Sequence, residues 1–502
     1  MSIKSILSIF FIGLGFIANA TAKNKTPALF QEHLIESSIA LTHPVIVADL
    51  LPQLGKEIAT LGVDEQGNRW LHIYEFDLQK ESYQVASALK VAKNIARFDI
   101  SDYSAGYQQS LYFLDKNSVF RFEPTTNSLE KIVDVKSIFL RDDPEYISRG
   151  DFVIDLNNDG LDELLLAGFE WLNLIRLSGG EATIQKLDSS AVAILDDNGI
   201  KFKPRPYFVQ DADGDQRKDI LIAAQGKLRG FYQQDNGTIA NMAVDIPLAK
   251  DISAIEWWHK RNAAGEGLDQ ADLIYRRLSQ LRDINNDGVV DMVVKATQSS
   301  GVLERVNDYQ VFMGSLHSGE LTFEPTPLSV ISAQGTLSGF ELVDINNDSV
   351  LEVILSGFDI GLSQIIGALL SGGIDQDVYL FSMGENGRFA KKPSVSKEVE
   401  LSFSLSSGQT GSPVVKLADI NGDKLKDLVL SDGTKKLKVY MASNNKRRFA
   451  RRALKYRTQL PQNGSAITVD DLNNDGKDDL VMKYGRLDDA GLARSIRLLI
   501  AN

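Results

Sequence analysis

The segment DLNNDGLDELLLAG, at residues 155–168, places a short acidic loop directly before an apolar run. Every copy of this loop carries acids at positions 1, 5 and 9, Asp or Asn at position 3, and an apolar residue at position 12. Five further copies occur, namely DADGDQRKDILIAA (211–224), DINNDGVVDMVVKA (283–296), DINNDSVLEVILSG (344–357), DINGDKLKDLVLSD (419–432) and DLNNDGKDDLVMKY (471–484). Such self-similarity indicates a repeat protein in which each copy is one structural unit.

The acidic side chains of one loop are suited to hold a metal ion. Alternate residues of a tight turn can direct their oxygens at one centre, as Asp155, Asn157, Asp159 and Glu163 would do. A backbone carbonyl and a water molecule would complete the shell of about six or seven hard oxygens that Ca2+ prefers. An EF-hand needs a Glu at position 12 and flanking helices, so the apolar position 12 argues against it. A single copy could equally be a simple Asn/Asp/Gly turn, but six copies with an acid at position 9 favour Ca2+.

The apolar run that follows each loop predicts a buried β-strand. Runs such as ELLLAG are apolar at successive positions, which is typical of a strand covered on both faces. Each repeat continues with an alternating strand, for example KLKVYMAS at 436–443, and then with a further segment that begins near a Phe. With a short strand before the loop, each repeat supplies four strands. Four-stranded sheets repeated radially form a β-propeller, an all-β fold.

The loops resemble the FG-GAP and VCBS repeats of integrin α-subunit propellers and of many secreted bacterial proteins. The resemblance extends from Asp155 to the C-terminus, and it implies up to six Ca2+ ions held by positions 1, 3, 5 and 9. Three loops lack the Gly expected at position 6, having Gln216, Ser349 and Lys424 instead. The implied ligands are Asp155, Asn157, Asp159, Glu163, Asp211, Asp213, Asp215, Asp219, Asp283, Asn285, Asp287, Asp291, Asp344, Asn346, Asp348, Glu352, Asp419, Asn421, Asp423, Asp427, Asp471, Asn473, Asp475 and Asp479.

Two degenerate repeats precede the six acidic loops. They begin at Asp49, with Glu57 at position 9, and at Asp99, and both lack acids at positions 3 and 5. We therefore expect eight blades, with metal in neither N-terminal repeat; seven blades are the alternative. The last repeat, ending with IRLLIAN at 496–502, is one strand short, and LFQEHLIESS at 29–38 could supply that strand. Pairing the two termini would close the ring and remove an exposed edge.

The N-terminus reads as a secretory signal peptide over residues 1–22, followed by a single propeller over 23–502. Lys4 precedes an apolar run at 6–18 and small-residue endings of the Ala-x-Ala type. We expect an exported bacterial protein, periplasmic or extracellular, that is monomeric and has no transmembrane segment in its mature form. The net charge of −13 argues against nucleic acid as a partner. There is no Cys, so bound metal rather than disulfides would stabilise it.

Three insertions interrupt the repeat, at 254–277, 297–308 and 359–377. Metal loops join the first and second strands of a blade, whereas these insertions join second to third strands or one blade to the next. They should therefore lie together on the face opposite the metal loops, on neighbouring blades. Long loops on a rigid scaffold often carry function.

Two groups of side chains in the insertions are candidates for contact with a partner. Trp257, Trp258 and His259 could stack on a sugar or fill a pocket, or could anchor the insertion to its own blade. The uncharged stretch with Ile365, Ile366, Leu369 and Leu370 could be an exposed docking patch or a helix that caps the ring. The expected function is a Ca2+-binding propeller that acts as a protein- or glycan-binding adhesion module.

The alternative function is a secreted carbohydrate-active enzyme, a polysaccharide lyase or hydrolase built on the same scaffold. No nucleophile elbow, phosphate-binding loop or zinc-type His pair occurs, and no catalytic residue is nominated. A pocket lined by titratable groups on the insertion face would favour the enzyme. A flat aromatic or apolar patch there would favour binding.

Overall fold

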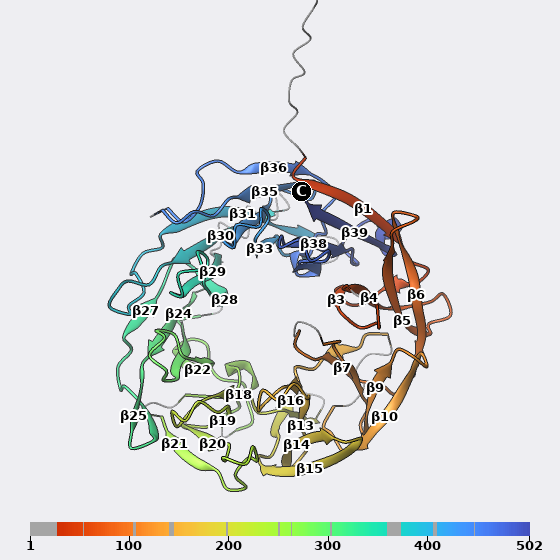
Figure 1. Ribbon diagram of the computed structural model, residues 1–502. Coiled ribbons are helices and arrows are strands. Elements are labelled where there is room, and N and C mark those ends of the chain that lie inside the picture. The colour runs from red at the N-terminus through yellow and green to blue at the C-terminus, as the bar shows by residue number, and fades with distance from the viewer. Residues whose placement is uncertain are drawn as a thin grey trace, which may run out of the picture.

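Eight sheets, each with four main antiparallel strands, succeed one another around a ring in the computed structural model (Figure 1). It describes residues 28–502 except 54, 104–106, 140–144, 197–198, 249–251, 263, 302–303, 359–372, 405–408 and 446. The expected all-β propeller of eight blades is confirmed, and the two degenerate N-terminal repeats form blades 1 and 2. The described residues contain no α-helix. The predicted signal peptide lies outside the described residues.

The first four blades follow one another along the chain, and the four main strands of each run from the innermost to the outermost. Blade 1 contains β2 (Ala40–Leu41), β3 (Ile46–Ala48), β4 (Glu57–Val63), β5 (Arg69–Asp77) and β6 (Ser82–Val91). Blade 2 contains β7 (Arg97–Ile100), β8 (Leu111–Leu114), β9 (Ser118–Glu123), β10 (Ser128–Asp134) and β11 (Ser148–Arg149), which pairs in parallel with β7. Blade 3 contains β12 (Val153–Ile154), β13 (Glu163–Ala167), β14 (Trp171–Ser178) and β15 (Glu181–Asp188). Blade 4 contains β18 (Tyr207–Gln210), β19 (Asp219–Ala224), β20 (Lys227–Phe231) and β21 (Val244–Pro247).

The last four blades complete the ring. Blade 5 contains β22 (Leu273–Arg282), β23 (Asp291–Ser299), β24 (Arg305–Phe312) and β27 (Ser329–Ile331). Blade 6 contains β28 (Thr336–Val343), β29 (Glu352–Phe358), β30 (Gly373–Phe381), β31 (Val395–Ser404) and β32 (Gln409–Thr410). Blade 7 contains β33 (Val415–Ala418), β34 (Asp427–Ser431), β35 (Lys436–Tyr440) and β36 (Leu454–Arg457). Blade 8 contains β37 (Ile467–Asp470), β38 (Asp479–Lys483), β39 (Ser495–Ala501) and β1 (Phe30–Glu36).

Blade 8 joins the two ends of the chain. β1 lies on the outer rim beside β39 (Figure 1) and pairs with it antiparallel, from Phe30 opposite Ala501 to Glu36 opposite Ser495. The expected closure by a strand from each terminus is therefore confirmed. The ring is held shut by ordinary strand pairing, and β39 is not left as an open edge.

The apolar run of each repeat becomes the second strand of a blade. All five residues of β13, β34 and β38 are buried, as expected for strands covered by neighbouring blades on both faces. One core cluster, for example, joins Leu165 of β13 with Ile220 of β19 and Phe231 of β20 in the next blade. Each of these second strands begins at the position-9 acid of its loop, and β4 likewise begins at Glu57.

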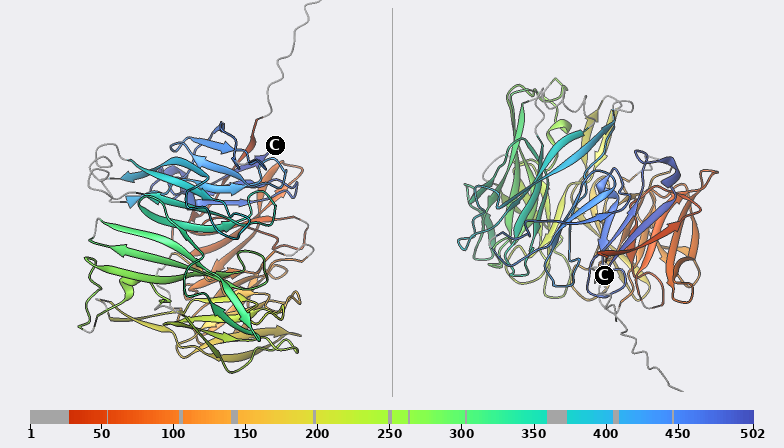
Figure 2. Two further views of the ribbon diagram at one scale, coloured as in Figure 1. Left: turned by 90° about the vertical axis from the view of Figure 1, so that its left-hand side faces the viewer. Right: turned by 90° about the horizontal axis from the view of Figure 1, so that it is seen from above.

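Two hairpins stand apart from the eight blades. The hairpin of β16 (Val192–Asp196) and β17 (Gly199–Lys203) lies between blades 3 and 4, and that of β25 (Gly314–His317) and β26 (Glu320–Phe323) lies within blade 5. Strands of the green region, which includes blade 5, project from one side of the ring (Figure 2). Of the 297–308 insertion, residues 297–299 lie in β23 and residues 305–308 lie in β24, and these two strands pair with each other.

Candidate metal centres and the opposite face

The six acidic loops share one backbone conformation. Each joins the first and second strands of one of blades 3 to 8. Positions 4 and 6 have positive φ in all six, and this includes Gln216 (68°), Ser349 (64°) and Lys424 (67°), which replace the expected Gly. Positive φ costs a residue with a side chain about 1–2 kcal/mol, so the surrounding structure imposes this turn. The three loops that lack Gly at position 6 therefore have the same backbone conformation as the loops that contain it.

Hydrogen bonds within each loop gather the side chains of positions 1, 3 and 5. In the Asp471 loop, Asp471 Oδ1 accepts the N–H of Asp475 (3.0 Å) and Oδ2 accepts that of Gly476 (2.9 Å). Asn473 Oδ1 also accepts the Asp475 N–H (3.1 Å), and Asp475 Oδ1 accepts the N–H of Lys477 (3.0 Å). Only part of each carboxylate is used by these bonds, which leaves oxygen lone pairs available to a cation.

The residues present fit a hard divalent cation. In the Asp211 loop, one oxygen each of Asp211, Asp213 and Asp215 lie within 4.8 Å of one another. Burial, followed by the neighbouring Asp215, raises the pKa of Asp213, as expected where like charges converge. In the Asp344 loop, Asn346 Oδ1 is buried without a hydrogen-bond partner. Carboxylate and amide oxygens gathered in this way are the ligands that Ca2+ accepts.

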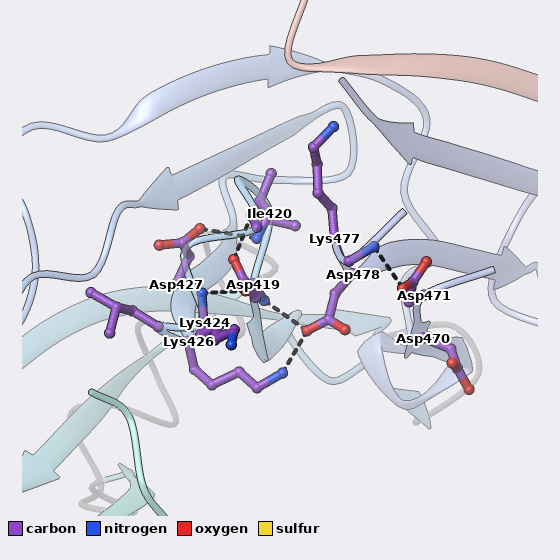
Figure 3. A network of polar contacts seen from close by, with 12 residues as sticks. Asp419, Ile420, Lys424, Lys426, Asp427, Asp470, Asp471, Lys477 and Asp478 are labelled. Atoms are coloured by element: carbon purple, nitrogen blue, oxygen red, sulfur yellow. Dashed lines mark hydrogen bonds and ion pairs between the residues drawn. The ribbon is translucent and has the colours of Figure 1, made fainter. Parts of the chain in front are cut away.

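Adjacent acidic loops are joined by direct contacts. Figure 3 shows the Asp419 and Asp471 loops of blades 7 and 8, with Asp478 between them. Asp478 Oδ2 accepts the backbone N–H of Asp419 (2.7 Å) and the ammonium of Lys426 (2.7 Å), while the Asp478 N–H donates to the Asp419 carbonyl (2.7 Å). The geometry of one loop is thus fixed partly by the next blade.

The acid at position 9 has a structural role that the sequence did not reveal. Asp479 is fully buried; its Oδ2 accepts the N–H of Leu472 (3.0 Å), and its Oδ1 accepts that of Ala501 at the end of β39 (2.8 Å). The corresponding pair of backbone amides is bound by Asp219, Asp291 and Asp427. This carboxylate therefore ties the loop to the third strand of its blade, whether or not it also binds metal.

The degenerate repeat at Asp49 supports this structural role. Glu57 is buried at position 9, and its Oε2 accepts the N–H groups of Leu50 (2.7 Å) and Leu51 (3.2 Å), although positions 3 and 5 carry no acid. At the next repeat, Asp99 Oδ2 accepts the N–H of Phe152 (2.5 Å), and Oδ1 pairs with Arg149 (3.1 Å). These two acids stabilise the backbone, and the absence of metal there stays a prediction.

On the opposite face, Trp257 to His259 form the short 3-10 helix η1 (Trp257–His259). The Arg305 guanidinium lies 5.6 Å from the centre of the Trp257 ring, which brings the 254–277 and 297–308 insertions together. His259 Nε2 lies 2.8 Å from Lys203 Nζ, while Trp258 is 49% exposed. Trp257 thus anchors the insertion, and Trp258 is available to a partner. Ile365, Ile366, Leu369 and Leu370 lie outside the described residues.

The β16–β17 hairpin extends this face and was missed in the sequence. Opposite pairs Ala193/Phe202 and Leu195/Ile200 share one side of the hairpin, and all four residues are exposed. Phe202 packs edge-to-face against Phe169 at 5.0 Å. The signal was an Asp-Asp-Asn-Gly turn between two apolar segments. We call Phe169, Leu195, Ile200, Phe202 and Trp258 the apolar surface.

A cleft of about 740 Å³ lies between blades 2 and 3, beside the Asp155 loop. Tyr112 and Arg121 of blade 2 line it together with Asp162 and Lys218, and the Tyr112 hydroxyl donates to Asp162 Oδ2 (3.0 Å). These titratable groups therefore converge on the side of the acidic loops and not on the insertion face. In the described part of the chain, no helix is long and apolar enough to cross a membrane.

The fold and loops define a β-propeller with recurrent acidic loops between its first and second strands. Residues 419–482, which include the Asp419 and Asp471 loops, match the family model described as FG-GAP-like repeat. The chain is therefore a β-propeller that carries an FG-GAP-like repeat, and the other four acidic loops have the same motif.

Comparison with solved structures gives matches at low sequence identity and low TM-score. An Agrocybe aegerita lectin that recognises non-reducing terminal N-acetylglucosamine is 14% identical, with a TM-score of 0.41, and the match covers 93% of this chain and 98% of the lectin. Saccharomyces cerevisiae Sqt1 is 11% identical, with a TM-score of 0.45 and the same coverage. A Lactobacillus plantarum protein is 9% identical, with a TM-score of 0.33, and the match covers 84% of this chain and 98% of that protein. No curated protein sequence matches the chain.

Proposed function

We propose that this protein is an exported Ca2+-binding β-propeller that acts as a protein- or glycan-binding module. Up to six ions stabilise blades 3 to 8 through the acidic loops, and the opposite face binds the partner. The observation that carries the proposal is the apolar surface, where Phe169, Ile200, Phe202 and Trp258 are each more than two-fifths exposed. Phe169 and Phe202 are in contact, and grouped exposed apolar side chains are typical of interaction sites.

In this proposal, one face of the ring binds the metal ions and the opposite face binds the partner. The acidic loops are short and similar to one another, and hydrogen bonds within each loop fix its shape. The opposite face carries longer, dissimilar segments on rigid blades, and a rigid support lowers the ordering cost of binding. Because aromatic and aliphatic groups predominate there, binding is favoured over catalysis. The alternative of a carbohydrate-active enzyme would be favoured if the cleft beside the Asp155 loop turned over a polysaccharide.

Site-directed changes should remove ions one at a time. Asp283→Ala and Asp471→Ala each delete two hydrogen-bond acceptors and a position-1 ligand, so each should reduce bound Ca2+ by one ion per chain. Asp49→Ala and Asp99→Ala should leave the metal content unchanged, because their loops lack the other acids. Elemental analysis after dialysis checks the four variants. Loss of an ion from Asp49→Ala or Asp99→Ala would show that the N-terminal repeats also bind metal.

Changes in the apolar surface should abolish binding without unfolding the protein. The double variant Phe202→Ser/Trp258→Ala removes two exposed rings, so it should weaken capture of glycans on an array, or of exported proteins, by at least about tenfold. Tyr107→Ala, which removes a 67% exposed ring from the other side, is the matched control. The Ca2+ content and melting temperature of both variants should equal those of the wild type. Unchanged binding by the double variant would place the binding site elsewhere.

A further inference from the structure

In one of the six acidic loops, an arginine from the neighbouring blade contacts the buried acid at position 9. Arg448, in the turn between β35 and β36 of blade 7, reaches the Asp344 loop of blade 6. Its Nη2 forms an ion pair with Glu352 Oε1 at 2.9 Å and lies 3.8 Å from Asp348 Oδ2. The Glu352 side chain is fully buried, and only 17% of the Arg448 side chain is exposed. The guanidinium therefore lies between the acids of positions 5 and 9.

The turn that carries Arg448 holds it firmly in this place. Arg448 has a φ of 59°, its N–H donates to the Asn445 carbonyl (3.0 Å), and its carbonyl accepts the N–H of Ser443 (2.7 Å). The next residue, Phe449, is buried in a core cluster with Ile345 and Ile354 of blade 6. A residue with a side chain adopts positive φ at a cost, so packing against blade 6 must fix this turn.

In the other acidic loops, the acids at positions 5 and 9 are contacted by groups of their own loop or blade. The position-9 acids Asp219, Asp291, Asp427 and Asp479 use their second oxygen to accept a backbone N–H from their own blade. Arg217 and Lys477 contact the position-5 carboxylates of their own loops, and both project from the loop's own position 7. Arg448 instead comes from the neighbouring blade and contacts the buried position-9 carboxylate.

We propose that Arg448 takes the place of Ca2+ in the Asp344 loop, so that five of the six loops bind metal. This inference rests on the proposed Ca2+ binding by the other loops. Arginine stays charged at any physiological pH, and it cannot leave without stranding the buried Glu352 carboxylate. A divalent ion about 4 Å from the guanidinium would bind roughly thirtyfold or more weakly, even with the screening of bulk water.

The cage beneath Arg448 is otherwise complete. Asp344 accepts the N–H groups of Asp348 (3.2 Å) and Ser349 (2.8 Å), as position 1 does in four of the other five loops. Asn346 Oδ1 is buried and has no hydrogen-bond partner, so it is available as a ligand. Removal of the guanidinium should therefore create a metal site.

Metal counting tests this inference directly. The wild type, dialysed against Ca2+ and analysed for bound metal, should hold five ions per chain, and Arg448→Ala should hold six. Arg448→Lys retains a cation and should hold five. Arg447→Ala, which removes the same charge from the exposed neighbouring residue, should also hold five. If Arg448→Ala still holds five ions, the inference is overturned.

A second pair of variants keeps the test valid if Arg448→Ala does not fold. Asp344→Ala should cost the wild type no ion, whereas Asp283→Ala should cost one. Six ions in the wild type and five in Asp344→Ala would overturn the assignment to Arg448 alone. A wild type that binds no Ca2+ would instead contradict the proposed function, so the two failures are distinguishable.

Discussion

Chelation of Ca2+ is expected to lower the melting temperature of this protein by about 5–10 °C. An ion that binds only the folded state stabilises it by about 1.4 kcal/mol per site at ten times Kd. Five such sites add about 7 kcal/mol, and a chain of this length loses about 1 kcal/mol of stability per degree near its midpoint. Differential scanning calorimetry in EGTA and in excess Ca2+ measures the change.

The ion that restores stability should be Ca2+ and not Mg2+. Mg2+ keeps several waters and requires near-octahedral geometry, which a loop of four protein side chains does not match. The control is therefore Mg2+ at the same concentration, which should recover little of the lost stability. An identical melting curve in EGTA, together with no bound metal by elemental analysis, would contradict Ca2+ binding in every loop.

The same measurement should depend on pH. Burial raises the pKa of Asp219 and Glu163 to about 7, and that of Asp291 and Asp479 to about 6. A raised carboxyl pKa means that the folded state keeps protons that the unfolded chain has lost. The stability of the metal-free protein should therefore fall as the pH rises from 5 to 8. Ca2+ supplies the missing positive charge, so its stabilising effect should be larger at pH 8 than at pH 5.5.

The ring could be predicted because the sequence features that specify each blade are close together in the chain and recur in every repeat. Each acidic loop marks the turn between two strands, and its apolar run marks a strand buried on both faces. Blade 1 could be placed from Asp49 at position 1 and Glu57 at position 9. Glu57, like Asp479, accepts the backbone N–H of the residue that follows position 1. Closure was predictable because one strand was missing at the C-terminus and one was spare at the N-terminus.

The remaining features depend on contacts between distant parts of the chain. Arg448 and Glu352 are 96 residues apart in sequence and meet only because blades 6 and 7 are adjacent. In four of the six loops, the position-9 acid makes its second bond to a backbone N–H at or just beyond the end of the third strand, whose distance in sequence from the acid varies with loop length. The sequence of the β16–β17 hairpin contains a turn signal. The hairpin lies between two blades and matches no repeat, so an analysis based on the repeats does not identify it.

Loss of the position-9 acid should destabilise the protein far more than loss of a position-1 acid. Asp479→Ala removes a fully buried carboxylate that accepts the N–H groups of Leu472 and Ala501, two residues that are themselves buried. Each buried donor left without an acceptor costs about 1–3 kcal/mol, so the change should cost roughly 3–5 kcal/mol in total. Since these amides lose their partner with or without metal, the loss should persist in EGTA.

Asp471→Ala is the matched control within the same loop. Its carboxylate accepts the N–H groups of Asp475 and Gly476, which are exposed, so water can replace it. Its cost should appear in Ca2+ and nearly vanish in EGTA. Urea unfolding of both variants under the two conditions separates the roles. If Asp479→Ala also became harmless in EGTA, the acid at position 9 would be a metal ligand and nothing more.

The location of Asp479 predicts which strand is destabilised first when this side chain is removed. Ala501 ends β39, the strand that pairs with β1 to close the ring, so the carboxylate fixes the inner partner of the closing strand. Asp479→Ala should therefore increase hydrogen exchange in β1 (Phe30–Glu36) before exchange rises in blades 3 to 7. The equivalent change Asp291→Ala removes the same pair of bonds from blade 5 and should leave β1 protected. Equal exchange in β1 for the two variants would mean that the ring opens as one cooperative unit, with no weak point at its closure.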